Sequence, residues 1–306
     1  MSEWGYLLPT REQVMSGSMV TGLFLDRARL ARDLGFESVW VGDSLLARPR
    51  HDPVTLLAGV TAAVPELTIG TAVLLPALRN PVVLAQQLAT VDQLSEGKLV
   101  VGAGIAADNP AIRSEFKAAG VPFESRLGRF MEGWDLCRAL WQGDEVTWDG
   151  RWEVRGSLAP TPFREGGPPL WLASSVPQGI ARAAKRYEGW FPIGPNLETF
   201  TEQQALFSEE TAKQGRDPLT TAIYLTVAVG DNAAEAEASI ESYLTDYYQM
   251  PGEIMRRFQA CCGGTVDEVM EFIAGFEAAG ASHIVLRIVG DHEKTLRSLA
   301  ASRLNR

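Results

Sequence analysis

One stretch of the sequence, residues 67–104, limits the folds that this chain can adopt. It begins with a short apolar strand (67–75), continues with an amphipathic helix (81–94) and ends with a second apolar strand (98–101). Apolar side chains recur at helical spacing in the middle segment, and Pro81 suits the first turn of a helix. Such a strand, helix and strand form one βαβ unit with parallel strands and a right-handed crossover. We expect the rest of the chain to repeat this unit.

Strands and helices are predicted to alternate along nearly the whole chain. The predicted strands are residues 4–8, 38–41, 67–75, 98–101, 170–173, 189–194, 222–229 and 283–289, and residues 10–18 are predicted to be a polar loop. The predicted helices are residues 24–34, 53–64, 81–94, 177–187, 199–215, a helix from 233, 265–279 and 293–303. This alternation fits a (β/α)8 TIM barrel, formed as a single domain by residues 1–306. A doubly wound sheet needs fewer strands and usually a glycine-rich first turn, which this chain lacks.

Two long excursions interrupt the alternation, at about residues 105–168 and 243–264. The first contains a predicted helix (124–141) and a hairpin (146–154) whose turn is marked by Asp149-Gly150. The second excursion is rich in aromatic residues. Excursions of this length inside a repeating fold are usually functional loops or lids.

Charge and composition exclude several classes of protein. The formal net charge is −10, whereas nucleic-acid-binding proteins usually carry a basic patch. The three cysteines (Cys137, Cys261 and Cys262) lack the spacing of a metal site or a disulfide framework, which is typical of a reduced compartment. Neither a signal peptide nor an apolar run of membrane-spanning length is visible. We therefore expect a cytoplasmic protein that binds neither metal, nucleic acid nor membrane.

The TIM-barrel prediction also locates the chemistry, because reactive groups lie where the barrel strands end. Ser174 and Ser175 follow one strand and precede Pro177 at the start of a helix. Their hydroxyls and the exposed N–H groups of that helix could bind a phosphate; the alternative is an ordinary N-cap serine. The same rule selects Asp43 and the small residue Gly104, which lets the backbone approach a ligand closely.

Five blocks of the sequence resemble the bacterial-luciferase-like superfamily of flavin- or deazaflavin-dependent (β/α)8 oxidoreductases. They are residues 30–44, 67–104, 115–141, 169–194 and 263–287, and they occur in family order. The resemblance implies that a flavin ring lies on a bulge after the third strand, with a non-proline cis peptide at Ala72-Val73 or a neighbouring bond. It also implies a phosphate-binding turn at Ala173-Ser174-Ser175, and a further cofactor contact at Ile193-Gly194.

Two departures from the family pattern affect the predicted chemistry. Family members often have a histidine directly after the acidic residue that matches Asp43, but here that position is Ser44. FMN-dependent members often have an arginine after the fourth strand, and residues 104–108 contain none. The cofactor therefore stays open between FMN and coenzyme F420.

Several side chains are candidates for the substrate site. His51 lies in a basic loop after the second strand, and Arg79 lies in the loop after the third. Tyr247 belongs to an aromatic set that also includes Tyr243, Tyr248 and Trp148. Packing within the protein is the alternative role for each of them. His283 is expected in the core, and His292 on the surface.

The resemblance favours an enzyme that uses reduced FMN and O2 to oxygenate a small organic substrate. An F420-dependent hydride transfer is the first alternative, and a flavin-binding protein without turnover is the second. Asp43 is the candidate catalytic acid or base; alternatively it caps the loop before the second helix. The expected protein partners are a second copy of the chain, in a homodimer, and a flavin reductase that supplies reduced flavin.

Overall fold

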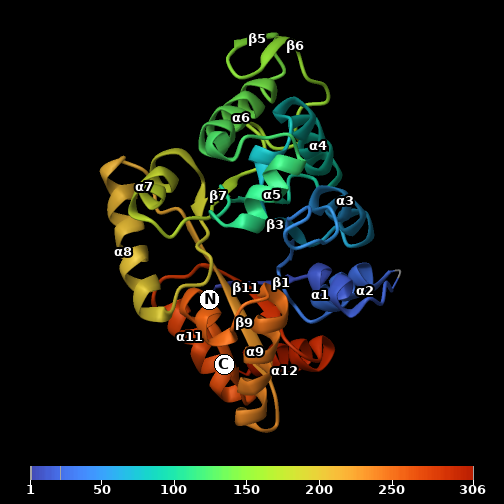
Figure 1. The fold of residues 1–306 in the computed structure, drawn as a ribbon, viewed down its shortest axis with the longest axis vertical. Coiled ribbons are helices and arrows are strands. Elements are labelled where there is room, and N and C mark those ends of the chain that lie inside the picture. Colours follow the sequence, from blue (N-terminus) through green and yellow to red (C-terminus); the bar gives the residue numbers. More distant parts are fainter. Residues whose placement is uncertain (1, 21, 306) are drawn as a thin grey trace. The chain divides into compact units, whose positions relative to one another are not determined.

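The computed structural model describes residues 2–20 and 22–305 (Figure 1). It shows an eight-stranded parallel β-barrel with surrounding helices, which confirms the predicted TIM barrel. Around the barrel the strands follow one another in chain order, β11 lies next to β1, and β9 also pairs with β8. The barrel strands are β1 (Glu3–Leu7), β2 (Ser38–Val41), β3 (Thr68–Leu74), β4 (Leu99–Ala103), β7 (Leu170–Leu172), β8 (Gly189–Trp190), β9 (Thr220–Val229) and β11 (His283–Ile288).

Helices follow most of these strands, and shorter elements fill the excursions. The helices are α1 (Thr10–Ser16), α2 (Leu23–Asp33), α3 (Pro53–Ala63), α4 (Pro81–Leu94), α5 (Pro110–Ala118), α6 (Arg126–Leu140), α7 (Pro177–Arg186), α8 (Leu197–Lys213), α9 (Ala233–Tyr248), α10 (Gly252–Met255), α11 (Val266–Ala278) and α12 (His292–Leu304). The remaining elements are the strands β5 (Val146–Asp149), β6 (Glu153–Gly156) and β10 (Cys261–Gly264), and the 3-10 turns η1 (Pro76–Leu78), η2 (Phe123–Ser125) and η3 (Arg256–Phe258). Among the described residues, no helix is both long and apolar enough to cross a membrane.

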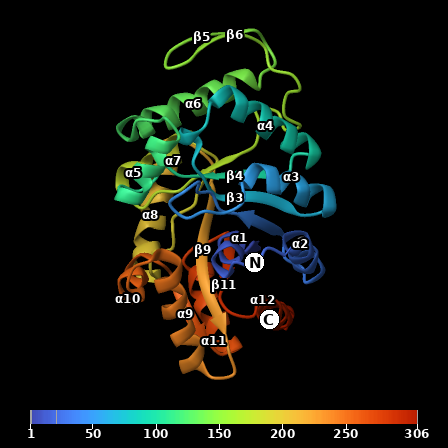
Figure 2. The same ribbon diagram turned by 45° about the vertical axis from the view of Figure 1, so that its right-hand side comes forward.

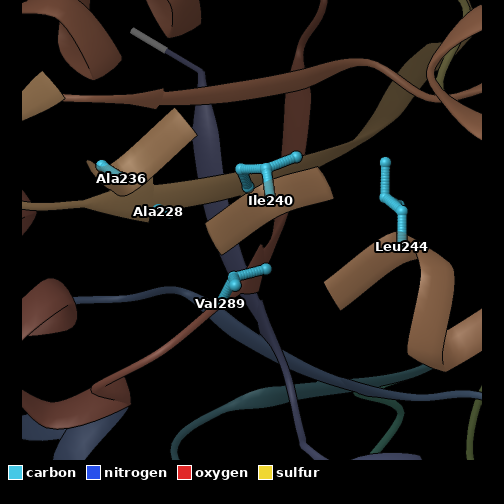
Figure 3. Close-up of a cluster of buried hydrophobic side chains, with 5 residues drawn as sticks. All are labelled: Ala228, Ala236, Ile240, Leu244 and Val289. Atoms are coloured by element: carbon cyan, nitrogen blue, oxygen red, sulfur yellow. The ribbon is translucent and has the colours of Figure 1, made fainter. Parts of the chain in front are cut away.

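The chain divides into two compact units, and the divisions fall inside β2 and β7. The first unit comprises residues 1–40 and 171–306. In it β9 pairs in parallel with β11, and β11 pairs with β1. The helices α9 and α11 pack against β9, as Figure 2 shows. Apolar side chains of α9 form a buried cluster with one residue of β9 and the residue that follows β11, drawn in Figure 3: Ala228, Ala236, Ile240, Leu244 and Val289.

This cluster gives a direct test of core packing. Leu244 is fully buried, whereas Leu304, near the end of α12, is 86% exposed. We expect Leu244→Ala to lower the free energy of unfolding by about 2–5 kcal/mol, because it removes buried methyl groups and leaves a cavity. Leu304→Ala, the matched control, should change it by less than about 0.5 kcal/mol. Urea denaturation of both variants measures the difference, and equal losses would contradict this packing.

The second unit comprises residues 41–170. Its strands β3 and β4 pair in parallel, α3 packs on β3, and α4 packs on both α3 and α6. The antiparallel pair β5–β6 confirms the predicted hairpin. The helix α5 in the first excursion was not predicted. It begins with Pro110 at its first position and is capped by Asn109, whose side chain accepts a hydrogen bond from the Ile112 N–H.

Two predictions of local structure were wrong in the first unit. Residues 10–16, predicted as a polar loop, form α1, because Glu12 lies in the first turn and the left-handed Gly17 ends the helix. Thr10 and Gln13 are both buried in this helix. Because their side chains are polar, the sequence did not indicate that the segment packs against the protein. The second excursion is also more regular than expected: α9 continues to Tyr248, and residues 261–264 form β10. Because β8 pairs only with the start of β9, the C-terminal half of that edge is free to pair with β10.

The histidines differ from one another in their surroundings. His283 is a buried core residue, as predicted: its Nε2 lies 2.8 Å from Ser38 Oγ and its Nδ1 3.0 Å from a Glu3 carboxylate oxygen. The prediction for His292 was wrong. Its Nδ1 lies 2.8 Å from the hydroxyl of the buried Tyr6, and its side chain is largely enclosed. Burial, with a further contribution from the charge of Arg27, lowers the pKa of His292 to about 4.

This lowered pKa predicts a pH dependence of stability. The unfolded chain binds a proton at His292 as the pH falls through about 6.5, whereas in the folded chain His292 stays neutral down to about pH 4. Stability should therefore fall with decreasing pH across this window, by about 3 kcal/mol from this residue. His292→Gln cannot titrate, so its free energy of unfolding should vary less between pH 7 and pH 4. Urea denaturation at several pH values measures this, and parallel curves for the two proteins would contradict it.

Candidate functional site

The peptide bond between Ala72 and Val73 is cis, as the family resemblance predicted. It lies near the end of β3, where the register against β4 shifts between Thr71 and Leu74. Thr71 and Leu74 are fully buried, whereas Ala72 and Val73 are partly exposed. The bulge therefore presents a short piece of backbone and two small apolar side chains to a ligand.

Asp43, the candidate catalytic residue, is engaged in holding the chain just after this bulge. Its Oδ2 accepts hydrogen bonds from the Leu75 N–H at 2.9 Å and from Arg79 Nη1 at 2.5 Å, and its Oδ1 accepts one from Arg79 Nη2 at 3.1 Å. The Asp43 side chain is 2% exposed and that of Arg79 15%. A paired carboxylate this deeply buried positions its neighbours. A role as catalytic acid or base stays a prediction.

Arg79 extends this contact to the next helix. Its Nη2 also donates to Asp52 Oδ2 at 3.2 Å, and Asp52 caps α3 by accepting a hydrogen bond from the Thr55 N–H at 2.8 Å. The alternative role of Asp43, as the cap before this helix, is therefore filled by Asp52. Burial of Arg79 opposes its charge, but the two carboxylates outweigh burial and raise the pKa of its guanidinium.

Asparagine substitutions distinguish the two carboxylates that bind Arg79, those of Asp43 and Asp52. Asp43→Asn should lower the free energy of unfolding by about 3–5 kcal/mol, because it leaves a largely buried guanidinium without its main partner. Asp52→Asn is the matched control. That side chain is 47% exposed, and asparagine also caps helices well, so a loss of about 1 kcal/mol or less is expected. Denaturant unfolding compares the two variants. An equally small loss of free energy of unfolding in both would show that Asp43 is not the main partner of Arg79.

The turn after β2 is organised by a residue that sequence reasoning missed. Glu115, on α5, is fully buried, and its Oε1 accepts hydrogen bonds from Ser44 Oγ at 2.8 Å, from the Leu46 N–H at 2.8 Å and from the Leu45 N–H. Ser44 stands where family members often have histidine, and here its hydroxyl binds this carboxylate. Only the unpredicted helix α5 brings Glu115 to the turn, so no local pattern could identify it.

Two basic residues lie in the loop after this turn: His51, a predicted substrate contact, and its neighbour Arg50. His51 is half-buried there, and a substrate contact stays a prediction. Arg50 lies against Gly42: a Cβ added at Gly42 would come within 2.3 Å of Arg50 Nη1 and 3.4 Å of the Ala72 carbonyl oxygen. The glycine therefore allows a guanidinium to approach the end of β2, close to the cis bond.

Cations also reach the turn after β4, although residues 104–108 contain no arginine. The Gly104 N–H donates to the Leu74 carbonyl at 2.8 Å, which joins this turn to the end of β3. Arg126, from α6, donates to the Ala106 carbonyl at 3.3 Å, and its guanidinium stacks 3.8 Å from the centre of the Phe123 ring. The basic group of this turn thus comes from twenty residues further along the chain.

In the first unit, hydrogen bonds fix the predicted phosphate-binding turn, and Ser174 Oγ accepts one from the Val176 N–H at 3.5 Å. Trp190 Nε1 donates to the Ser174 carbonyl at 2.7 Å and Gln203 Nε2 donates to the Ser175 carbonyl at 3.0 Å, so the backbone is fixed. Val176 is the N-cap of α7, and no side chain of the described residues caps that helix. The ordinary N-cap role is therefore not filled by either serine.

Close packing at the start of α7 supports the same site. A Cβ at Gly179, in the first turn, would come within 1.8 Å of Ser174 Oγ, so only glycine lets the hydroxyl sit over the helix end. Ser174 is half-buried and Ser175 is exposed, while Ala173 is buried beneath them. Two hydroxyls at the positive end of a helix dipole suit a phosphate, so these residues fit the phosphorylated cofactor that the resemblance implies.

Large apolar side chains are exposed where several strands end. In the first unit Val176 follows β7 with 57% exposure and Ile193 follows β8 with 49%. At Gly194, with φ +48°, a Cβ would come within 2.9 Å of the Ala260 nitrogen. In the second unit Leu45 and Leu46 follow β2 and are 44% and 61% exposed. Exposed apolar patches often mark binding surfaces, and these suit the flat ring of a flavin.

Tyr247, the third substrate candidate, lies beside a charged residue that was also missed. It is buried, and its ring centre is 4.9 Å from the guanidinium carbon of Arg287. A single arginine in the apolar strand IVLRIV was the signal available in the sequence. No group of three or more potential metal ligands occurs among the residues described, 2–20 and 22–305.

Comparison with known proteins identifies the family. A model of the family described as "Luciferase-like monooxygenase" matches residues 2–283. The chain belongs to this family. The chain is accordingly a member of a flavin- or F420-dependent oxidoreductase family, and relatives of both kinds are found.

The similar proteins differ in their named cofactors. An F420-dependent glucose-6-phosphate dehydrogenase of Nocardia farcinica is 32% identical over 202 residues, which span 63% of this chain and 60% of that protein. The monooxygenase RslO1 of Streptomyces bottropensis is 23% identical, with a TM-score of 0.84 over 99% of both chains. The FMN-bound oxygenating component of 3,6-diketocamphane monooxygenase of Pseudomonas putida is 18% identical, with a TM-score of 0.79 over 98% of this chain and 96% of that one. The two structural matches show a shared fold.

Proposed function

We propose that this protein is an F420-dependent oxidoreductase that transfers a hydride to or from a small organic substrate. The observation that carries the proposal is the partly exposed bulge of β3 at Ala72 and Val73, the place on which flavin and deazaflavin rings lie in this family. The 32% identity to an F420-dependent dehydrogenase favours F420 over FMN. The sequence left the cofactor open but placed oxygenation with reduced FMN before F420-dependent hydride transfer, and the proposal reverses the order of these two functions.

The residues of the chain would share the work of binding and orientation. When bound, F420 supplies a two-electron hydride carrier. Ala72 and Val73 support its ring, and Asp43 and Arg79 hold that support in place. Ser174 and Ser175, at the positive end of the α7 dipole, would bind a phosphate of the cofactor. Exposed apolar side chains of the same unit as that support, Leu45 and Leu46, would exclude water from the ring.

Oxygenation with reduced FMN is the second candidate function. The arginine that FMN-dependent members often have after the fourth strand is missing from the local sequence, but Arg126 brings a guanidinium to the same turn. That contact favours FMN. A flavin reductase would then be the natural supplier of reduced flavin. For both candidate functions we propose that the protein is the homodimer predicted from the sequence.

Titration of the purified protein with both cofactors tests the proposal. We expect F420 to bind more tightly than FMN, by roughly tenfold or more in Kd, as followed by cofactor fluorescence. Anaerobic assays of F420 reduction by a panel of alcohols and aldehydes, and of O2 uptake with reduced FMN, then separate hydride transfer from oxygenation. Tighter FMN binding together with O2 uptake would replace the proposal by its second candidate, and binding without turnover on any substrate would indicate a flavin-binding protein.

The phosphate site has its own test. Ser174→Ala combined with Ser175→Ala should weaken cofactor binding by about 1–3 kcal/mol, the range for hydrogen bonds to a charged group. Ser208→Ala, at an exposed position of α8, is the control and should leave the affinity unchanged. Fluorescence titration measures all three proteins. Unchanged affinity in the double variant would show that the phosphate binds elsewhere.

A further inference from the structure

The side chain of Arg287 is a buried cation near the C-terminal end of β11. Its residue is 1% exposed, and it lies opposite Thr226 of β9 in the parallel ladder. Arg287 Nε and Nη2 both donate to Thr226 Oγ1, at 3.0 and 2.7 Å, so the two side chains share one face of the sheet. In a TIM barrel the C-terminal end of a strand is where substrates bind.

No carboxylate neutralises this cation within the described part of the chain. Its other hydrogen bonds go to neutral oxygens, from Nη1 to the Tyr248 hydroxyl at 3.1 Å and from Nη2 to Gln259 Oε1 at 3.1 Å. Glu12 is the nearby acidic residue, and it accepts a hydrogen bond from the Tyr243 hydroxyl instead. A buried charge without an ionic partner is unfavourable unless something compensates it.

Four tyrosine rings enclose the guanidinium. The distances from its central carbon to the ring centres are 4.8 Å for Tyr224, 5.2 Å for Tyr243, 4.9 Å for Tyr247 and 5.6 Å for Tyr248. Burial raises the pKa of Tyr224 and Tyr243, so these phenols stay neutral and the cluster keeps its positive charge. Aromatic faces offset part of the cost of that charge and form flat apolar walls.

A short segment lies between two hydrogen-bond partners of Arg287. Tyr248 and Gln259, which both accept hydrogen bonds from Arg287, stand immediately before and after residues 249–258. This segment contains only α10 and the 3-10 turn η3, and it exposes Met250, Ile254 and Phe258 by 45%, 40% and 61%. Two neutral hydrogen bonds therefore hold the ends of a segment whose apolar side chains face water.

We propose that Arg287 binds the carboxylate of a planar substrate, which replaces Tyr248 and Gln259 as the partner of its N–H groups. The tyrosines are then the walls for the planar part of the substrate, and residues 249–258 close over it with their apolar side chains. An anion satisfies the cation better than the two neutral oxygens do, because charge-assisted hydrogen bonds are stronger. The inference names the substrate class for the redox function proposed above and rests on it.

Benzoate and its neutral analogue benzamide test this site without any cofactor. Isothermal titration calorimetry of the purified protein should show benzoate binding at least roughly tenfold more tightly than benzamide, because only benzoate pairs with the guanidinium. Arg287→Gln should abolish this preference, whereas Arg297→Gln, at an exposed position of α12, should retain it. Equal affinities for the two compounds, or binding of neither, in the wild-type protein would overturn the proposal.

A second variant tests the site even if Arg287→Gln fails to fold. Tyr248→Phe keeps the cation and removes one competing hydrogen-bond acceptor, so benzoate should bind it at least as tightly as the wild type, with benzamide unchanged. A marked loss of benzoate affinity in that variant would overturn the replacement of Tyr248 by the ligand. Because no cofactor is present, a benzoate preference without F420 binding would refute the proposed redox function alone, and F420 binding without the preference would refute this site alone.

Discussion

All eight strands of the barrel run in the same direction, and most features of this protein depend on that constraint. After each strand the chain must return outside the barrel before the next one begins, so each strand ends in a turn at the same rim. The turns can then carry polar groups without disturbing the apolar core. Asp43, the bulge at Ala72-Val73, Ser174 and Arg287 all lie at or near the end of a strand.

Buried carboxylates hold two of these turns by accepting hydrogen bonds from their backbone. Asp43 binds both the Leu75 N–H and Arg79, and Glu115 gathers the N–H groups of the turn after β2. Both carboxylates are almost completely enclosed, so solvent does not compete for their hydrogen bonds. The support beneath the proposed cofactor ring is therefore set by ionic contacts between segments that are distant in sequence. Such preorganised support keeps a ligand in one orientation.

The fold was predictable because burial repeats with a local period. The apolar runs of β3 and β4 and the amphipathic α4 follow from spacing alone, and the cis bond follows from the family resemblance. The partners of charged residues do not follow from spacing. Glu115 is 71 residues from Ser44, Arg126 is 20 residues from Ala106, and Arg287 is 61 residues from Thr226. For the same reason β10 and the enclosure of His292 were missed, since each depends on a contact made by the folded chain.

The central claim is that the bulge of β3 carries the ring of the cofactor. A crystal structure of the complex with F420 tests it most directly. We expect the deazaflavin ring within about 4 Å of Ala72 and Val73, in van der Waals contact. Electron density for F420 whose ring does not contact Ala72 or Val73 would contradict the account.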